Sequence, residues 1–259
     1  MNIDSLVVEV TRKCNMQCGH CLRGKAENVC MSRQVIEAIT RKVRYTNTLT
    51  VTGGEPSLAV NVINDFLDCA RWNNFSYNSF YMVTNGKTIR QPFLDVITRL
   101  FVEQEDGEVS RVSLSNDEYH REFLTSDRGR QRLEELIEEL ELRGLVTWEG
   151  NRLNARNASS GGYTDSRQII AVGNAKNFGG KELEFATLSV DEEYNDYVSE
   201  GEIYINCFGE VFPCCDMSYE MQRDGLHKLG NILDQDFDLI KAIKKYNKSL
   251  SNVHDSVNA

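Results

Sequence analysis

The stretch VTRKCNMQCGHCLRG, residues 10–24, places three cysteines in the spacing C-x3-C-x2-C. It follows directly on an apolar, β-branched run at residues 5–10, which predicts a β-strand. The cysteines are therefore expected on the loop that leaves the carboxyl end of this strand. In parallel α/β barrels the active site is built at that end of the strands. The stretch thus predicts both the start of the fold and a site on it.

The three thiols at Cys14, Cys18 and Cys21 favour a metal centre. A structural zinc site needs a fourth ligand close by, for which the sequence offers His20 and Cys30. A cube-shaped 4Fe–4S cluster held by three cysteines leaves one iron without a protein ligand. That open coordination position is typical of a catalytic metal centre rather than a closed structural one. A zinc-binding module without catalysis is the alternative.

Strand and helix patterns alternate from the N-terminus to Gly144. Strands are predicted over 5–10, 48–54, 79–86 and 109–115, and helices over 32–45, 58–72, 88–102 and 126–144. Four strand–helix units in a row predict a parallel sheet covered by helices. Beyond Gly144 the pattern weakens, and the strand candidates are 145–148, 152–156 and 168–172.

The C-terminal part has a different character. Residues 201–215 predict a β-hairpin that turns near Phe208–Gly209, and residues 236–246 predict a helix. The tail after this helix is expected to fray. The chain is therefore expected to divide into a barrel-like α/β core, 1–185, and a small hairpin-and-helix appendage, 186–259.

The composition disfavours several classes of protein. The chain has 259 residues, with 29 Lys and Arg against 39 Asp and Glu, and a formal net charge of -10. This acidic balance disfavours a broad nucleic-acid-binding face, which needs clustered Lys and Arg. No apolar run approaches the ~18 residues of a membrane span, and the N-terminus has no pattern of a secretory signal. We therefore expect a cytoplasmic protein whose eight cysteines are reduced.

Further motifs stand at the ends of the next predicted strands. They are VTGGEP at 51–56, VTNG at 83–86 and VSLSNDEYH at 112–120. In this order, and together with the three cysteines, they resemble the motifs of the radical S-adenosylmethionine (radical SAM) superfamily over roughly residues 3–175. The family's last motif carries an acid where this chain has Ser115.

The resemblance implies a partial (βα)6 barrel, similar to a TIM barrel, in which Cys14, Cys18 and Cys21 hold a 4Fe–4S cluster. S-adenosylmethionine would bind the open iron, and reduction by a donor such as a flavodoxin or ferredoxin would yield a 5′-deoxyadenosyl radical that abstracts a substrate hydrogen. The residues implied for S-adenosylmethionine are Gly53, Gly54 and Glu55 at its methionine end, and Thr84, Asn85, Ser113, Ser115 and Arg156 for polar contacts.

The C-terminal part carries a second, partial resemblance. GEVFPC at 209–214 and LGNI at 229–232 are similar to the SPASM/Twitch extension, in which such a hairpin helps to bind an auxiliary iron–sulfur cluster. By this resemblance Cys207, Cys214 and Cys215 would hold a second cluster. The family's cysteine before the glycine, and those after the hairpin, are absent here. Buried thiols without a metal are therefore the alternative.

No motif identifies the substrate or a catalytic acid or base. Asp117, Tyr119 and His120 follow the fourth predicted strand, where they either transfer a proton or begin a helix. Family analogy favours a peptide or protein side chain as the substrate, because enzymes with such extensions commonly modify peptides. A nucleotide, nucleoside or sugar is the alternative.

Overall fold

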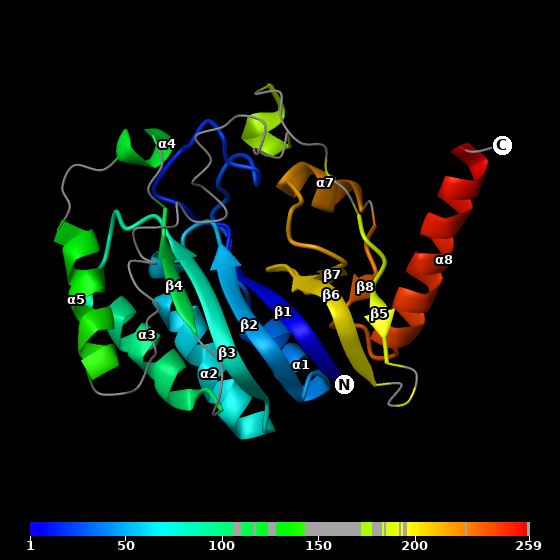
Figure 1. The fold of residues 1–259 in the computed structure, drawn as a ribbon, viewed down its shortest axis with the longest axis horizontal. Helices are drawn as coiled ribbons and strands as arrows, with labels where there is room; N and C mark the ends of the chain where they lie inside the picture. Colours follow the sequence, from blue (N-terminus) through cyan, green and yellow to red (C-terminus); the bar gives the residue numbers. More distant parts are fainter. Residues whose placement is uncertain are drawn as a thin grey trace.

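The computed structural model describes residues 1–105, 110–115, 118–123, 128–142, 172–177, 183, 185–191, 193, 196–225 and 227–257. Strands and helices alternate through the N-terminal part (Figure 1). In chain order they are β1 Asn2–Thr11, α1 Arg33–Lys42, β2 Tyr45–Gly53, η1 Pro56–Leu58, α2 Val60–Asn73, β3 Ser76–Thr84, α3 Gln91–Glu103, β4 Arg111–Leu114, α4 Glu118–Arg121 and α5 Arg128–Leu142. The later elements are η3 Gly173–Asn177, β5 Ser189–Val190, β6 Tyr197–Ile205, β7 Glu210–Phe212, α7 Tyr219–Asp224, β8 Gly230–Asn231 and α8 Leu239–Val257.

The described strands form one sheet in the order β4-β3-β2-β1-β6-β7-β8, with β5 added to β6. β1 lies between β2 and β6 and pairs in parallel with both. β3 and β4 continue the parallel part beyond β2, whereas β7 and β8 are antiparallel. Because β4 and β8 end the sheet on opposite sides, it is not closed. The predicted fold class, an α/β fold with a partial barrel, is confirmed.

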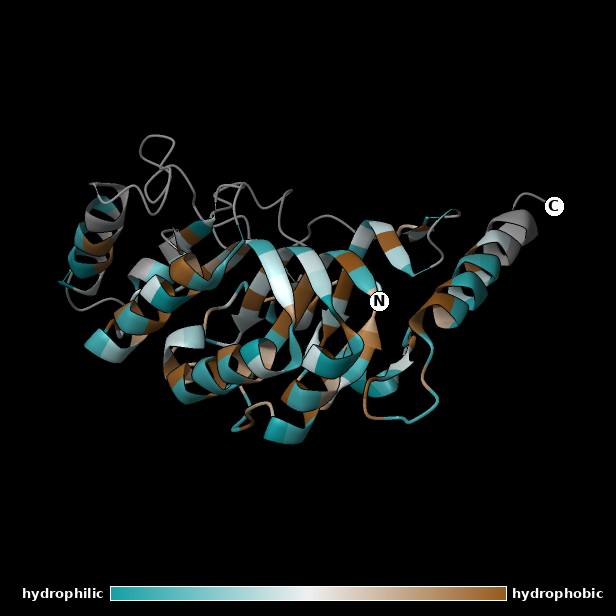
Figure 2. Ribbon diagram, turned by 90° about the horizontal axis from the view of Figure 1, so that it is seen from below, coloured by the Kyte–Doolittle hydropathy of each residue, from teal (hydrophilic) through white to brown (hydrophobic). Residues whose placement is uncertain are grey.

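The first strand is buried on both faces, as its near-continuous apolar run predicts for a central parallel strand. Leu6, Val8 and Val10 belong to the main core, which also includes the apolar faces of α1, α2 and α3. These helices form a layer on one side of the sheet (Figure 2). On the other face, Val7 packs with Tyr204 from the C-terminal part. Burial of both faces makes β1 the centre of the fold.

The first helix begins where the sequence predicts and ends at Lys42, three residues before the predicted end, because Tyr45 begins β2. The Ser32 side chain accepts a hydrogen bond from Val35 N–H, which caps the helix N-terminus. Arg41 and Lys42 occupy the last turn, where positive charge favours the helix dipole. The chain then turns directly into β2, so that the end of β2 lies beside the end of β1.

The C-terminal hairpin and helix are present as predicted, but two features differ from expectation. β6 lies parallel beside β1, so the hairpin extends the central sheet. α8 continues to Val257, so the tail that was expected to fray is helical to that residue. In Figure 1, α8 stands at the edge of the molecule. The boundary between residues 185 and 186 stays a prediction.

Three strand candidates, 145–148, 152–156 and most of 168–172, lie outside the described residues. The (βα) units that the structure describes are therefore those of β1 to β4. Among the described helices, none combines the length and the apolar character that crossing a membrane requires.

Candidate active site

The three cysteines of the first motif lie on one loop and line one cavity. Residues 12–30, which we call the cysteine loop, connect β1 to α1. Cys14, Cys18 and Cys21 all line a cavity of about 690 Å³. Cavities of ~300–1,000 Å³ are typical of small-molecule and cofactor sites. None of the eight cysteines takes part in a disulfide bond.

A short turn from far along the chain holds the backbone of the cysteine loop. Asn174, in η3, donates its backbone N–H to Cys21 O at 2.9 Å and its side-chain Nδ2 to Cys18 O at 3.1 Å. Gly173 approaches so closely that a Cβ there would lie 2.1 Å from Leu22 O. Sequence reasoning missed Asn174. The Gly-Asn pair directly after a strand candidate was the signal that could have found it.

Two glycines at the end of β2 pack directly against the cysteine loop. A Cβ on Gly53 would lie 2.2 Å from Thr11 O, and one on Gly54 would lie 2.3 Å from Lys13 O. Gly54 N–H also donates to Thr11 O at 2.7 Å. Both glycines line the cavity. Close approach to a ligand is therefore only part of the reason for glycine here, because backbone atoms of this chain already fill both Cβ positions.

The carboxylate of Glu55 joins the ends of β2 and β3. Glu55 is 1% exposed and lines the cavity. Its Oε1 accepts from Thr84 Oγ1 at 2.6 Å and from Ser57 N–H at 3.1 Å. Its Oε2 accepts from Asn85 N–H at 2.8 Å. Glu55 thus fixes the turn of the VTNG motif, whatever contact it makes with a ligand.

Asn85 connects the third strand end to the first cysteine. Its Nδ2 lies 3.8 Å from Cys14 Sγ and donates to Asn15 Oδ1 at 2.9 Å. Met16 N–H also donates to Cys14 Sγ, at 3.4 Å. Burial raises the pKa of Cys14, while the bonds from Met16 and Asn85 act in the opposite direction. They favour the thiolate, which is the form that binds metals.

The fourth strand end brings one of its two candidate serines to the cavity. Ser115 lines the cavity, and its N–H donates to Thr84 O at 2.9 Å. Ser113 is buried in β4 and does not line the cavity, and its contact with S-adenosylmethionine stays a prediction. Arg156 lies outside the described residues, and its contact with S-adenosylmethionine stays a prediction.

Two of the three candidate proton-transfer residues lie against the cysteine loop. Tyr119 and His120 belong to α4, and both rings contact His20, with centroids at 4.5 and 5.1 Å. His20 and His120 line the cavity, whereas Tyr119 does not. Asp117 lies outside the described residues. The helix expected at these positions is present, and ring packing accounts for where both side chains lie.

The three C-terminal cysteines do not gather at one place. Cys207 lies in the turn after β6, where its thiol donates to Glu9 O at 3.2 Å. The register of β6 with β7 places Cys214 level with Glu202, at the opposite end of the hairpin. The hairpin therefore does not bring Cys207 and Cys214 opposite each other. Cys215 alone of the three lines the cavity. The second cluster that the resemblance implies for these thiols stays a prediction.

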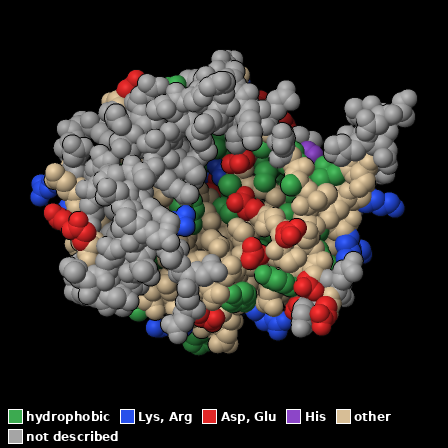
Figure 3. Space-filling model, in the orientation of Figure 1, with side chains coloured by type: hydrophobic (Ala, Val, Ile, Leu, Met, Phe, Trp, Pro, Cys, Tyr) green, Lys and Arg blue, Asp and Glu red, His purple; other side chains and the backbone are tan. Residues whose placement is uncertain are grey.

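The C-terminal part also supplies side chains to the cavity wall. Glu202 from β6 lines the cavity together with Asp216 and Tyr219. Burial raises the pKa of Glu202, and hydrogen bonds from Cys215 partly offset this effect. On the face shown in Figure 3, acidic side chains gather over the region of β6 and β7. Sequence reasoning singled out none of these three residues, because their distance along the chain conceals their common position.

The thiols of the cysteine loop fit an iron–sulfur cluster. Three free thiols share one cavity wall, and the carbonyls of Cys18 and Cys21 are already bonded to Asn174. Within the described part of the chain, no three His, Cys, Asp or Glu side chains converge closely enough to hold a single metal ion. A cubane cluster does not require such convergence, because each cysteine binds a different iron.

Comparisons with known proteins cover both parts of the chain. Residues 197–258 match the SPASM family, an iron–sulfur cluster-binding domain. No curated protein matches the chain. Among solved structures, native anSMEcpe with bound AdoMet and Kp18Cys peptide superposes with a TM-score of 0.56 at 16% identity, over 96% of this chain and 82% of that chain. A histidine-tagged form of anSMEcpe with bound AdoMet gives 0.55 at 15% identity, over 95% and 82%.

At these identities the likeness is one of fold. anSMEcpe is a radical SAM enzyme, and its likeness spans nearly the whole of this chain. It confirms the fold that the strand-end motifs predict. The SPASM match supports the resemblance of the C-terminal part, whose residues 197–258 we call the SPASM-type segment.

Proposed function

We propose that this chain is a radical SAM enzyme that cleaves S-adenosylmethionine at a 4Fe–4S cluster held by Cys14, Cys18 and Cys21, and that it modifies a peptide or protein. The proposal is carried by the three free thiols that one loop places in the wall of one cavity. When bound, the cluster and S-adenosylmethionine supply a 5′-deoxyadenosyl radical that abstracts a substrate hydrogen. A flavodoxin or ferredoxin as electron donor and a cytoplasmic location belong to the same proposal, and the free thiols support a reducing compartment.

The residues around the cysteines would position and enclose the reactants. Gly53 and Gly54 leave room for the cysteine loop against the end of β2. Glu55 holds the two strand ends together and presents a buried carboxylate at the cavity. A carboxylate at this place suits the amino group of the methionine moiety, since opposite charges attract strongly in a buried site. Asn85 donates to the Cys14 sulfur and favours its thiolate form.

The cavity wall and a structural neighbour support a peptide substrate. The solved structure of anSMEcpe that shares the fold holds AdoMet together with a peptide. A wall built jointly by the core and the SPASM-type segment also offers a substrate contacts on both parts.

Anaerobic reconstitution with iron and sulfide tests the reaction. We expect about four irons per chain, absorption in the visible region that is typical of such clusters, and 5′-deoxyadenosine formed from S-adenosylmethionine under reductant. Cys18→Ser should abolish both iron binding and product formation. Cys69→Ser is the matched control, because Cys69 packs in the core cluster and should affect only stability. A colourless protein with one zinc per chain would establish the zinc-binding alternative instead.

The substrate class can be tested without knowing the substrate. Peptides and nucleotides or sugars are prepared separately from host cells grown in deuterated medium, and each fraction is incubated with the reconstituted enzyme. Hydrogen abstraction from a substrate transfers deuterium to 5′-deoxyadenosine, which mass spectrometry detects. We expect the label from the peptide fraction. Label from the nucleotide and sugar fraction alone would show that the peptide proposal is wrong while the reaction type is correct.

A further inference from the structure

Two buried arginines flank the cysteine motif, one on each side. Arg12 lies two residues before Cys14, and Arg23 lies two residues after Cys21. Arg12 is 1% exposed and Arg23 is 9% exposed. Burying a guanidinium is costly unless its donors are satisfied. The groups that satisfy these donors therefore determine where the two ends of the cysteine motif lie.

The polar partners of Arg12 come from three separate parts of the chain. Its Nε donates to Glu9 Oε2 in β1 at 3.0 Å, and its Nη1 donates to Glu27 Oε2 in the cysteine loop at 3.1 Å. Its Nη2 donates to Gln222 Oε1 in α7. Arg12 thus binds the start of the cysteine loop to its later part and to the SPASM-type segment. Charge-assisted hydrogen bonds of this kind are stronger than neutral ones.

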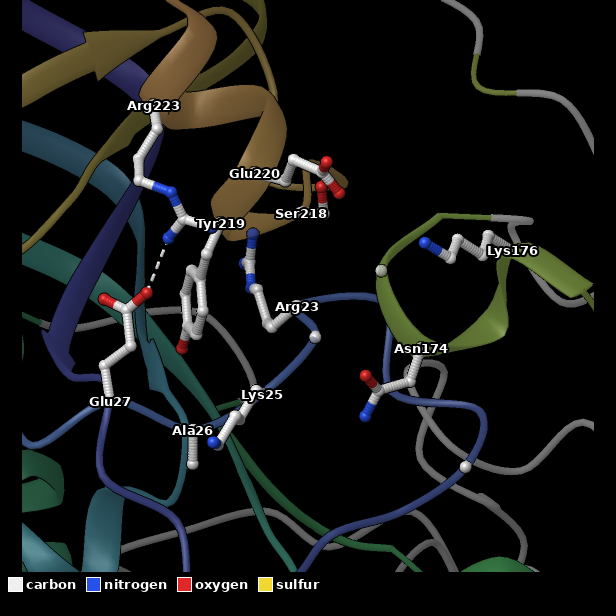
Figure 4. Close-up of a pocket in the computed structure, with 13 residues that line it drawn as sticks. Arg23, Lys25, Ala26, Glu27, Asn174, Lys176, Ser218, Tyr219, Glu220 and Arg223 are labelled. Atoms are coloured by element: carbon white, nitrogen blue, oxygen red, sulfur yellow. Dashed lines mark hydrogen bonds and ion pairs between the residues drawn. The ribbon is translucent and has the colours of Figure 1, made fainter.

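Aromatic rings of the same segment cover the Arg12 guanidinium. Its Cζ lies 4.2 Å from the ring centre of Tyr219 and 4.8 Å from that of Phe208. Figure 4 shows Arg223 of α7 directed back to Glu27, and their ion pair measures 2.6 Å. Glu27 is therefore held from two sides, by an arginine of the core and an arginine of α7.

Arg23 is bound to the SPASM-type segment in a different way. Its Nη1 donates to the carbonyl oxygens of Cys215 and Met217, the latter at 2.8 Å. Its guanidinium lies over the ring of Tyr204, 4.8 Å from the centroid. In return, Tyr219 N–H donates to Arg23 O at 3.0 Å. In Figure 4 the Arg23 side chain points from the cysteine loop toward Ser218 and Tyr219.

We propose that Arg12 and Arg23 are positioning residues through which residues 204–222 hold both flanks of the cysteine motif. Fixing both ends of a loop restricts the conformations of the thiols between them, which pre-organises a metal site. These contacts add to the side chains that the segment places in the cavity wall. The consequence for a cluster rests on the proposed function, whereas the contacts can be tested without one.

Hydrogen–deuterium exchange of the full chain without cluster tests the contacts directly. We expect Tyr219→Leu to speed exchange of the amides in residues 12–24 at least tenfold and to leave those of α2 unchanged. Tyr219→Phe is the matched control: no hydrogen-bond partner of the buried Tyr219 hydroxyl lies within the described residues, so only the ring should matter. Tyr219→Phe should exchange like the unmodified chain. Unchanged exchange in Tyr219→Leu would overturn the inference.

Substitutions of the arginines test the same contacts from the other side. Arg23→Met should speed exchange in residues 12–24 as Tyr219→Leu does. Arg23→Lys should not restore slow exchange, because lysine lacks the planar guanidinium that lies over the Tyr204 ring. Arg99→Met removes four hydrogen bonds on α3, against two for Arg23→Met, and should still leave the cysteine loop unchanged. If Arg99→Met speeds exchange in the loop equally, the effect is one of general stability and the inference is wrong.

The reconstituted protein supplies a second readout. We expect Tyr219→Leu to lose iron to a chelator about tenfold faster than Tyr219→Phe, and to show an altered electron paramagnetic resonance spectrum of the reduced cluster. Equal rates and identical spectra in the two variants would overturn the positioning role. If the unmodified chain binds no cluster, the proposed function fails, but the exchange experiment still decides whether the segment holds the loop.

Discussion

At the scale of single residues, Glu55 belongs to the GGE motif and also accepts the hydrogen bonds of a buried network. Its carboxylate accepts from Thr84, Ser57 and Asn85 at the same time. In Glu55→Gln one oxygen becomes an NH2 group that faces donors. Leaving buried donors without an acceptor costs about 1–3 kcal/mol. We expect the free energy of unfolding, measured by urea denaturation of the chain without cluster, to fall by that amount.

The control for this prediction is Glu37→Gln on α1. Glu37 pairs with Arg33 and Arg41 at the surface, where such pairs contribute at most about 1 kcal/mol. The free energy of unfolding of Glu37→Gln should therefore differ little from that of the unmodified chain. If Glu55→Gln is no more destabilising than Glu37→Gln, the carboxylate does not hold the two strand ends together.

Residues differ in how far sequence reasoning could place them. Cys14, Cys18, Cys21 and the GGE segment were predicted because their spacing and strand-end position are local features. Asn174 and the two arginines were not. Asn174 bonds to Cys21, which lies 153 residues earlier in the chain. The partners of Arg12 and Arg23 in the SPASM-type segment are separated from them by even more residues. No local sequence pattern predicts which distant group a side chain will hydrogen-bond.

At the scale of elements, the end of β2 packs against the cysteine loop with no space for a side chain. In Gly54→Ala the new Cβ would lie 2.3 Å from Lys13 O and 2.7 Å from Lys13 C, so the loop or the strand must move. Overpacking of this kind costs about 1–3 kcal/mol. We expect a lower free energy of unfolding in urea and, after reconstitution, less iron per chain than in the unmodified protein.

Gly225→Ala separates this steric effect from general glycine strain. Gly225 has a positive φ of 70° at the C-cap of α7, but nothing lies within 4 Å of its Cβ position. The Gly225→Ala variant should lose about 1 kcal/mol of stability through backbone strain. It should bind as much iron as the unmodified protein. Loss of iron in Gly225→Ala, or full iron in Gly54→Ala, would contradict a specific role of the β2 end.

The succession of elements was more predictable than their neighbours in the sheet. Apolar periodicity is local, so β1 to β4 and the helices α1 to α3 lie close to where the patterns predict them. The place of β6 was not predictable in this way. Its parallel pairing with β1 joins Ile3 to Val198 and Val8 to Ile205, and alternation within either strand does not specify such a distant partner.

At the scale of the whole molecule, the pairing of β1 with β6 makes the SPASM-type segment part of the main core. Ile203 and Ile205 of β6, and Leu239 and Ile243 of α8, belong to the same hydrophobic cluster as the helices of the N-terminal part. Two parts that share a core and a central strand are expected to unfold together. We therefore expect one cooperative urea transition, with near-ultraviolet and far-ultraviolet circular dichroism giving coincident midpoints.

Truncation extends this prediction to the separate parts. A chain that ends at residue 196 would lack β6, so β1 would become an open edge of the sheet, and Arg12 and Arg23 would be uncovered. We expect this chain to be insoluble or unfolded, because an exposed apolar edge strand promotes aggregation. A chain that ends at Leu250 keeps Leu239, Ile243, Tyr246 and Leu250 of α8, which belong to or pack on the core cluster, so we expect it to unfold like the full chain. Two separate transitions in the full chain, or a soluble and cooperatively folded 1–196 fragment, would show instead that the core folds independently, with the SPASM-type segment as a true second domain.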